Sequence, residues 1–280
     1  MNQEKAKQIT RAMKTLAREE SRFNINELRV IVALERAIAR LSNSKDLVDH
    51  LVFKGGFVLL KSYGSSRFTR DADALAISIS KGKLENSVST ALIIDLDDGL
   101  WFGDIQVQEL TDQDKYGAYR FSCAFQIGSP ELKKLHKLSR IHIDIGVSDR
   151  LPAKPADQVM SSVLDLEEPV TWKIYPVEYI VAEKLHTLFD RGSANSRAKD
   201  IYDLIYLFPR CEVRNALRSA ITNTFGNRDT PVPTSFAQQA DRFDKAILAN
   251  GWPGVKLSDQ KPNFEAAWRN LMDQLATLDG

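Results

Sequence analysis

Three aspartates in this sequence have the spacing of a catalytic centre that acts on phosphate. Asp71 and Asp73 stand one residue apart in TRDADALAIS, and Asp144 lies in the run RIHIDIGV. Both runs show the alternation of β-strands, so we expect strands over residues 70–79 and 139–147. Side chains two residues apart on a strand share one face. The first two carboxylates therefore project together and can hold one or two cations between them.

The third acid is also set apart from apolar packing. Alternation along its run assigns the isoleucines to the core face and His142 and Asp144 to the other face. Mg²⁺ takes oxygen ligands and is usually held by one or two carboxylates together with substrate phosphates. Three carboxylates around two ions would stabilise the attacking and leaving oxygens of an in-line displacement. We therefore predict Asp71, Asp73 and Asp144 as catalytic ligands of Mg²⁺ or Mn²⁺.

A glycine turn upstream of the acids is suited to the phosphates of a nucleotide. A short apolar strand is expected to end at Lys54, Gly55 and Gly56, and a helix follows. Glycine lets the backbone approach a ligand closely, and the start of a helix offers N–H groups and a positive dipole end to phosphate. Arg67 could pair with phosphate charge bidentately. These four residues are predicted to bind a nucleoside triphosphate.

Each of these features also has an ordinary structural explanation. A Gly-Gly pair is usually only a turn, Asp71 could pair with Arg67 or Arg70 on the surface, and Asp144 could face solvent on a half-exposed strand. The order of the features favours the catalytic interpretation. A strand, a glycine pair, a helix, an Asp-x-Asp strand and a later strand with one aspartate occur in succession.

The composition is that of a globular protein without extreme charge. The chain has 280 residues, of which 43% are hydrophobic, so it forms one large domain or two moderate ones. Its net charge of +1 gives no global attraction to nucleic acid. It has no apolar run of about 18 residues and no apolar signal core near its charged N-terminal segment. With only Cys123 and Cys211, we expect a cytoplasmic protein with reduced thiols and no membrane contact.

The pattern of elements predicts an α/β (α+β) fold with a mixed β-sheet core flanked by helices. Residues 1–150 are assigned to an α/β core with N-terminal helices. Residues 176–280 are assigned to a largely helical region that completes the active-site cleft. The proline-containing stretch 151–175 is predicted to be a connecting segment.

Two helices in the segment EYIVAEKLHTLFDRGSANSRAKDIYDL add further candidates. Lys184 on the first helix, which ends at Gly192, could neutralise triphosphate charge. Arg197 and Asp200 are three apart on the second, so they can reach one cleft together, and Asp200 could orient or deprotonate an incoming hydroxyl. The ordinary alternative makes Glu183–Lys184 and Arg197–Asp200 surface pairs, worth about 0.2–0.5 kcal/mol each.

Three segments of the chain resemble a known fold and a known family. They are KGGFVLLKSYGSSRFTRDAD, IHIDIG and EYIVAEKLHTLFDRGSANSRAKDIYDL. They resemble the nucleotidyltransferase fold shared with DNA polymerase β and, more narrowly, the AbiEii/AbiGii toxin family, which includes the MenT toxins. The last segment is the most specific, because a plain polymerase-like transferase has no reason to carry it. Many transferases of this fold have Gly-Ser where this chain has Gly55-Gly56, so no hydroxyl contact is expected there.

The resemblance implies a toxin that transfers a nucleotide from a nucleoside triphosphate, using Mg²⁺. Relatives modify the acceptor end of tRNA and so block aminoacylation and growth. The resemblance also implies a cognate antitoxin as a partner. By the match, Asp71 and Asp73 are metal ligands and Asp144 is the third acid. The residues that complete the site are Lys184, Arg197, Lys199 and Asp200.

Two other functions remain open at this stage. The same chemistry could act on a small molecule or a protein hydroxyl, which the near-neutral charge favours, since tRNA binding depends on neutralised phosphates. A catalytically silent nucleotide- or RNA-binding module ranks last, because all three aspartates are present.

Overall fold

The structure is a computed structural model that describes residues 1–19, 22–110, 117–130, 132–148, 153–192 and 197–279. The chain divides into two compact units. The first, the sheet unit, is Met1–Leu151 with Pro155–Ile174, and the second, the helical unit, is Pro152–Lys154 with Tyr175–Gly280. The sheet unit carries the three aspartates, and the helical unit carries Lys184 and Asp200.

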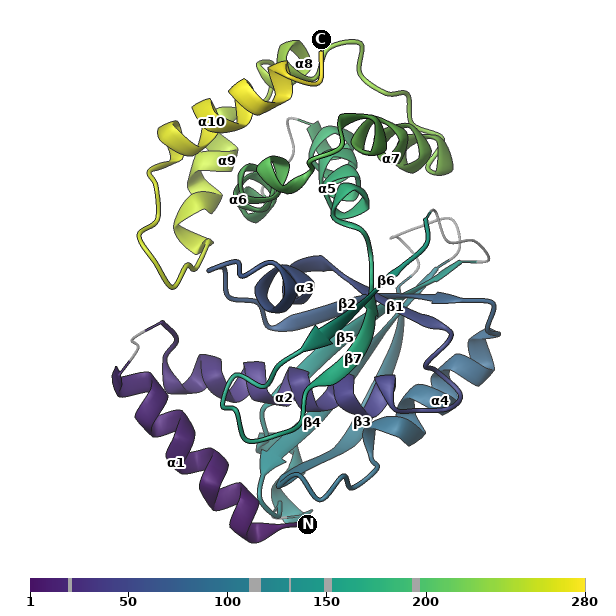
Figure 1. Ribbon diagram of the computed structural model, residues 1–280, viewed down its shortest axis with the longest axis vertical. Helices are drawn as coiled ribbons and strands as arrows, with labels where there is room; N and C mark the ends of the chain where they lie inside the picture. Colours follow the sequence, from purple (N-terminus) through teal and green to yellow (C-terminus); the bar gives the residue numbers. More distant parts are fainter. Residues whose placement is uncertain (20–21, 111–116, 131, 149–152, 193–196, 280) are drawn as a thin grey trace. The chain divides into compact units, whose positions relative to one another are not determined.

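Within the described residues, seven strands form one mixed sheet in the order β3-β4-β5-β2-β1-β7-β6 (Figure 1). β2 runs parallel to β5 and β1 parallel to β7, whereas the other neighbours are antiparallel. This arrangement confirms the predicted mixed α/β class. The strands are β1 (Leu51–Lys54), β2 (Asp71–Ile77), β3 (Leu100–Leu110), β4 (Ala118–Ile127), β5 (Arg140–Ser148), β6 (Ala156–Met160) and β7 (Val170–Ile174).

Two helices precede the sheet, α1 (Gln3–Glu19) and α2 (Ile25–Ser42). A capping box fixes the start of α2. The Asn24 side chain accepts hydrogen bonds from the backbone N–H groups of Asn26 and Glu27, both at 3.0 Å, and the Glu27 carboxylate accepts one from the N–H of Asn24. An N-cap of this kind stabilises a helix by about 0.5–2 kcal/mol.

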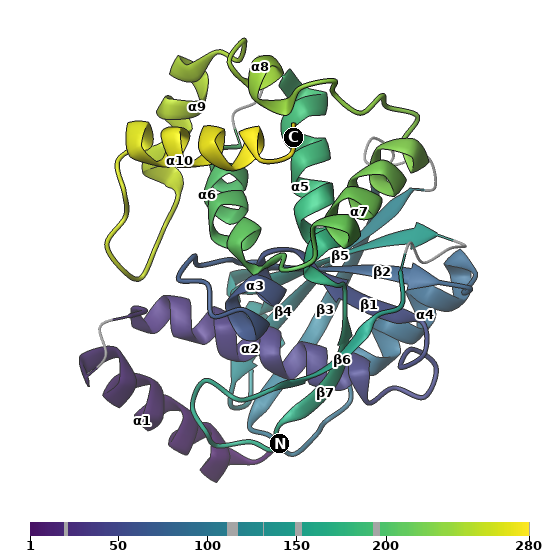
Figure 2. The ribbon, with the colours of Figure 1, turned by 45° about the horizontal axis from the view of Figure 1, so that its top comes forward.

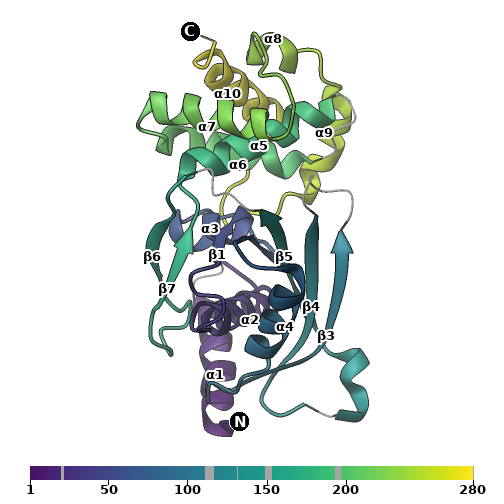
Figure 3. The ribbon, with the colours of Figure 1, turned by 90° about the vertical axis from the view of Figure 1, so that its right-hand side faces the viewer.

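The sheet has an apolar face and a polar face. Three isoleucines of β5 are fully buried, whereas His142 and Asp144 alternate with them and are half-buried. α2 packs against β5 and β7, and α4 (Lys81–Leu92) packs against α2 and β3. Figure 3 shows both helices inside the curve of the sheet. The aspartates therefore lie on the face of the sheet that points away from α2.

Two strands lie within residues 151–175, where the sequence predicted a connecting segment. β6 and β7 form an antiparallel pair whose register runs from Ala156 opposite Ile174 to Met160 opposite Val170. Alternate residues of β7 are buried, among them Trp172. Prolines on both sides of these short strands obscured the pattern. Residues 156–174 consequently belong to the sheet unit rather than to a linker.

The helical unit is built around α5 (Val177–Arg191), which packs against α6 (Ala198–Leu207) and α7 (Arg214–Asn227) (Figure 2). α5 ends at the predicted Gly192, whose φ is 47°. The later helices are α8 (Phe236–Ala240), α9 (Lys245–Gly251) and α10 (Phe264–Ala276). Among the helices described, none has the length and apolar character that a membrane span requires.

Candidate active site

The strand register brings the three predicted acids onto one face of the sheet. Asp71 and Asp73 lie two apart on β2, and Asp144 of the parallel strand β5 is the register partner of Asp73. Side chains of register partners on neighbouring strands point to the same face. His142 is the partner of Asp71, so it belongs to the same group. We call Asp71, Asp73, His142, Asp144 and their neighbour Arg120 the acid face.

Asp71 is held in place by a short hydrogen bond. The hydroxyl Oγ1 of Thr69, which is buried, donates to Oδ1 of Asp71 at 2.5 Å. Hydrogen bonds from a hydroxyl to an ionised carboxylate are typically 2.5–2.7 Å long and about twice as strong as neutral ones. The bond therefore orients this carboxylate at the start of β2.

The glycine turn lies directly against the acids. Gly55 has φ of 74°, which favours glycine, and a Cβ at this position would collide with the carboxylate of Asp73. A Cβ at Gly56 would lie 2.6 Å from Nη2 of Arg67 and 3.2 Å from Oγ1 of Thr69. The two glycines are thus required by the close approach of predicted site residues. The structure brings Gly55, Gly56, Arg67 and Asp73 together.

The turn also begins a helix, α3 (Gly55–Ser62). Its N-cap residue, Lys54, makes no side-chain capping hydrogen bond, and the first turn contains no acidic residue. Lys54 is the register partner of Asp73 on β1, so its side chain is directed to the acid face. The start of α3 is therefore equipped to receive an anion through backbone N–H groups and the helix dipole.

Arg120 is a site residue that the sequence did not reveal. It is the register partner of Asp144 on β4, and its guanidinium donates to both carboxylate oxygens, Nε to Oδ1 at 2.8 Å and Nη2 to Oδ2 at 2.7 Å. The pKa of Arg120 is raised, chiefly by its hydrogen bonds to Asp144 and further by the charges of Asp144, Asp71 and Asp73, while burial opposes the shift. All three carboxylates thus act on one cation.

His142 is the neutral member of the acid face. Its pKa is lowered, mainly because the ring is partly buried and also because Arg120 is close, while the charges of Asp144 and Asp71 oppose the shift. Its other register partner is Ser122 on β4, whose hydroxyl accepts a hydrogen bond from Nε of Arg140 at 2.8 Å. The sequence assigned His142 to the polar face but gave no reason to assign it a role.

A metal site fits this face as a pair of carboxylates. Among the described residues, no group of three or more His, Cys, Asp or Glu side chains is placed to hold one ion. Asp144, predicted as a third ligand, accepts hydrogen bonds from two nitrogens of Arg120. Asp71 and Asp73 are two oxygen donors on one strand face, beside the turn suited to phosphate. Two carboxylates together with substrate phosphates are the donor set usual for Mg²⁺.

The predicted residues of the helical unit form a separate cluster between α5 and α6. Nζ of Lys184 lies 3.1 Å from Oδ1 of Asp200 and 2.6 Å from Oδ2 of Asp203, and Nε of Arg197 lies 3.0 Å from Oδ2 of Asp200. Both carboxylates are buried, at 1% and 0% exposure. Lys199 is half-buried in the first turn of α6. We call Lys184, Arg197, Asp200 and Asp203 the lysine cluster.

Asp203 was missed by the sequence analysis. The signal was present in RAKDIYDL, since Asp200 and Asp203 are three residues apart and therefore share a helix face. The structure also corrects the ordinary interpretation of Lys184 as a surface partner of Glu183. Lys184 pairs with the next helix, and Glu183 lies 3.9 Å from Arg228. The Arg197–Asp200 pair is present, but its carboxylate is buried rather than exposed.

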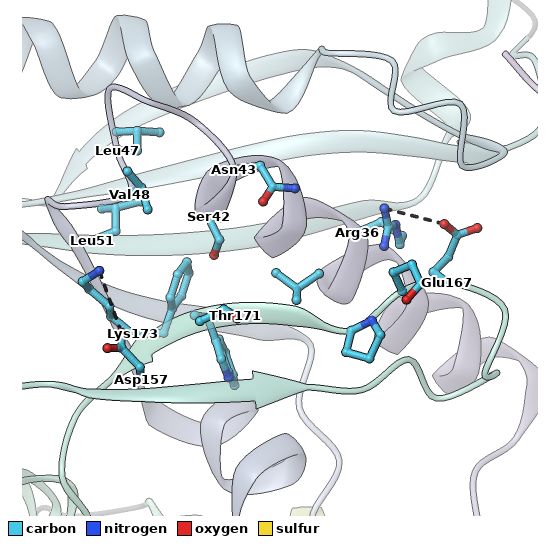
Figure 4. Close-up of a pocket in the computed structure, with 15 residues that line it drawn as sticks. Arg36, Ser42, Asn43, Leu47, Val48, Leu51, Asp157, Glu167, Thr171 and Lys173 are labelled. Carbon is cyan, nitrogen blue, oxygen red and sulfur yellow. Dashed lines mark ion pairs between the residues drawn. The ribbon is translucent and has the colours of Figure 1, made fainter.

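A cavity of about 440 Å³ in the sheet unit is distinct from the acid face (Figure 4). It is lined by α2, the turn that follows α2, and strands β1 and β7. Leu51 and Phe53 line it, and these residues alternate on β1 with Lys54, which faces the acids. Two ion pairs flank it, Arg36–Glu167 at 4.0 Å and Lys173–Asp157 at 3.8 Å. No residue of the acid face lines this cavity.

The fold and the glycine–aspartate arrangement define a protein of the nucleotidyltransferase type. Two crystal structures of Helicobacter pylori proteins are similar to this chain. JHP933 has 19% identity over 91% of this chain and 89% of its own, with a TM-score of 0.49. A second protein, proposed to be a nucleotidyltransferase, has 19% identity over 91% and 92%, with a TM-score of 0.50. At this identity the likeness shows the fold alone.

The family is shown by the sequence as a whole. The family model described as "Nucleotidyl transferase AbiEii toxin, Type IV TA system" matches residues 36–279. The chain therefore belongs to the AbiEii family of nucleotidyltransferase toxins, as the resemblance of its three segments predicted. No curated protein matches this chain.

Proposed function

We propose that this protein transfers a nucleotide from a nucleoside triphosphate to the acceptor end of a tRNA, with Mg²⁺ held by Asp71 and Asp73. As a toxin of a type IV toxin–antitoxin system, it would thereby block aminoacylation, translation and growth. The observation that carries the proposal is the contact between the Asp73 carboxylate and the glycine turn at the start of α3. The contact joins the predicted metal donors to a helix terminus suited to phosphate, in a chain of the AbiEii family, and so supports the proposal.

The triphosphate would be bound at the start of α3. The left-handed conformation of Gly55 turns the backbone into the helix, and the N-cap residue Lys54 makes no side-chain capping hydrogen bond. Arg67 lies against Gly56, so its guanidinium can reach an anion at the same terminus. Lys54 adds a second cation on the strand side. The Ser hydroxyl found at this turn in many transferases is absent, so backbone groups carry the contact.

Asp71 and Asp73 would hold the divalent cation against the same phosphates. Their spacing on β2 directs both carboxylates to one face, and Thr69 orients the first of them. When bound, Mg²⁺ or Mn²⁺ supplies charge neutralisation at the transferring phosphoryl group. Oxygen donors of two carboxylates and of the triphosphate suit either ion.

In the proposed reaction, a hydroxyl oxygen of the acceptor forms a bond to the α-phosphorus of the triphosphate. The bond from that phosphorus to the bridging oxygen breaks, and pyrophosphate leaves with its electron pair. The hydroxyl proton passes to Asp144, which is the carboxylate on the side of the acids away from the glycine turn. Arg120 donates hydrogen bonds to both oxygens of Asp144 and so orients this carboxylate.

Lys184, Arg197, Lys199 and Asp200 are proposed to serve the same reaction, as the family resemblance implies. Lys184 would neutralise triphosphate charge, and Asp200 would orient an incoming hydroxyl. Their ion pairs within the helical unit show that both side chains are held firmly by partners before any substrate binds. A cognate antitoxin is the partner that membership of a toxin–antitoxin family supports.

A transfer assay tests this function. Purified protein is incubated with each labelled nucleoside triphosphate in turn, with total tRNA, and with Mg²⁺, Mn²⁺ or a chelator. We expect label in tRNA, release of pyrophosphate, and loss of both on chelation. Digestion of the product at its 3′ end should release the label. The absence of labelled RNA under every condition would refute the tRNA assignment.

The same assay separates the second candidate function. The net charge of +1 provides little of the attraction that binding to polyanionic RNA usually requires. If the acceptor is a small molecule or a protein hydroxyl, label will move to a small product or to a protein band instead. Triphosphate binding without any transfer would identify a silent binding module.

A further inference from the structure

His142 occupies a place on the acid face that the proposed reaction has not yet used. It lies on β5 two residues before Asp144, with Asp71 opposite it on β2 and Ser122 opposite it on β4. The ring is therefore flanked by Asp71 of the acid face on one strand and by Ser122 on the other. Its side chain is half-buried, so part of it is accessible from the substrate side of the sheet.

The ring has a buried polar atom that lacks a partner. Nδ1 of His142 is buried, and no hydrogen bond joins it to any described residue. It is the one acid-face atom among the buried side-chain nitrogens and oxygens of the described chain that have no hydrogen-bond partner. Buried polar groups in folded proteins are nearly always hydrogen-bonded, so such an exception calls for an explanation.

The burial of Nδ1 fixes which nitrogen carries the proton. A buried N–H without an acceptor is rarer and more costly than a buried lone pair. The favoured form therefore has a lone pair at Nδ1 and the proton at Nε2. Nε2 is the ring nitrogen that remains accessible, because it is neither buried without a partner nor bonded to a described residue. His142 thus presents one N–H donor on the acid face.

The order of strands indicates what this donor meets. Across the sheet, the glycine turn follows β1, the metal-binding acids lie on β2, and His142 and Asp144 lie on β5, beyond the acids. Neighbouring strands are about 4.8 Å apart. In an in-line displacement the attacking oxygen approaches from the side opposite the leaving pyrophosphate. With the triphosphate at the glycine turn, the β5 side is the side of the acceptor.

We propose that Nε2–H of His142 donates a hydrogen bond to an oxygen of the terminal ribose of the acceptor RNA. This inference rests on the proposed function and extends it to the recognition of the second substrate. It makes His142 an acceptor-binding residue, distinct from the groups that bind the triphosphate. The donated bond holds the terminal ribose so that its attacking hydroxyl lies toward Asp144.

Three substitutions at His142 test the proposal by their effect on the KM for each substrate. His142→Phe keeps a planar ring but removes the donor, so the KM for tRNA should rise about tenfold, as expected for one lost hydrogen bond. The KM for the triphosphate should stay within twofold of wild type. His142→Gln places an amide N–H near the position of Nε2 and should restore tRNA binding, whereas His142→Asn places it near Nδ1 and should not. His136→Phe removes an exposed histidine of the sheet unit and is the matched control.

The outcomes separate this inference from the function on which it rests. A wild-type protein that labels no tRNA would overturn both. A wild-type protein that labels tRNA, with His142→Phe unchanged in the KM for tRNA, would overturn only the role of His142. The role would also be overturned if the triphosphate KM rose instead, or if Asn restored binding and Gln did not. Thermal unfolding of each variant establishes that the comparison is made between folded proteins.

Discussion

The acid face of the sheet unit and the lysine cluster of the helical unit use the same kinds of side chain in different surroundings. On the acid face, Asp71 and Asp73 are half-buried, and the Asp73 carboxylate lies against the glycine turn. In the lysine cluster, Asp200 and Asp203 are almost fully buried, and Lys184 lies between their carboxylates. Half-buried carboxylates can exchange water for a cation, whereas buried ones depend on their protein partner.

Because of this difference in burial, removing a charge should have different consequences on the acid face and in the lysine cluster. A charge taken from the acid face removes a contact to substrate or metal and leaves no uncompensated ion in the core. A charge taken from the lysine cluster leaves buried partners unpaired, which is strongly destabilising. Substitutions of acid-face charges should therefore change activity and leave the free energy of unfolding nearly constant. Substitutions of lysine-cluster charges should lower the free energy of unfolding first.

The largest effect is expected for Asp73→Asn. The substitution keeps the size of the side chain and removes the charge of a metal donor, so transfer should fall about a thousandfold, corresponding to roughly 4 kcal/mol of transition-state stabilisation. The unfolding midpoint should stay near that of wild type. Asp157→Asn changes an exposed acid of β6 in the same unit and should alter neither quantity. Full activity of Asp73→Asn would remove Asp73 from the set of metal ligands.

Lys184→Met should reverse this pattern. The apolar side chain fills similar space but leaves Asp200 and Asp203 without their shared cation, and we expect a loss of about 3 kcal/mol in the free energy of unfolding. Urea denaturation followed by circular dichroism measures this loss. Adding Asp203→Asn should recover part of it, because one buried charge is then removed. If Lys184→Met matched wild type in stability and lost only triphosphate use, the lysine cluster would be catalytic in the same sense as the acid face.

Gly55→Ala is a smaller perturbation of the acid face through its backbone. Alanine at φ of 74° is strained, and its methyl group would push the Asp73 carboxylate away from the turn. A displacement of about 1 Å near reacting groups can reduce the rate about a hundredfold, and we expect a loss of this size in kcat. Gly82→Ala is the matched control, since a Cβ there meets no atom within 4 Å. Equal activity of the two variants would show that the turn does not position Asp73.

The sequence predicted the parts of the acid face that lie within one stretch of chain. The glycine pair, the β2 aspartates and the alternation that places Asp144 all follow from local periodicity. The role of Arg120 could not be derived in this way. It depends on the register between β4 and β5, which pairs it with Asp144 across 24 positions of sequence. Register is set by packing and turn geometry, and one sequence does not specify it.

The elements that the sequence analysis did not predict have weak local signals for physical reasons. α4, in KGKLENSVSTAL, buries Leu84, Val88, Ala91 and Leu92, but the asparagine, serines and threonine between them lower its helix propensity. β6 and β7 are short, and β7 buries only alternate residues. Tertiary pairing across the sheet stabilises such segments, so their conformation depends on contacts that a single sequence does not display.

The smallest predicted effect is on the pH dependence of stability, and it concerns the one cysteine of each unit. Burial raises the pKa of Cys123, in the sheet unit, to about 12. Burial also raises the pKa of Cys211, in the helical unit. A thiol whose pKa is higher in the folded state contributes stability that is fully present below the unfolded pKa, about 8.5. That stability is lost as pH rises from there toward 12. For Cys123, which is fully buried, we expect a loss of about 1 kcal/mol between pH 8 and 9.5. Cys211 is only partly buried, so water stabilises its thiolate. We therefore expect its pKa to be raised less than that of Cys123 and its loss of stability to be smaller.

Urea denaturation at several pH values, on wild type and on Cys123→Ala and Cys211→Ala, measures both contributions. Lysines and tyrosines also titrate in this range, but their contribution is common to all three proteins and cancels in the differences. The slope of stability with pH should flatten more in Cys123→Ala than in Cys211→Ala. The Cys123 thiol lies on the apolar face of the sheet, opposite Ile141, and is fully buried. Equal slopes in the two variants would mean that the helical unit excludes water from its thiol as completely as the sheet does. The expected difference between a partly exposed thiol in the helical unit and a fully buried thiol in the sheet unit would then be wrong. The loss of stability with pH would not depend on how deeply each thiol is buried.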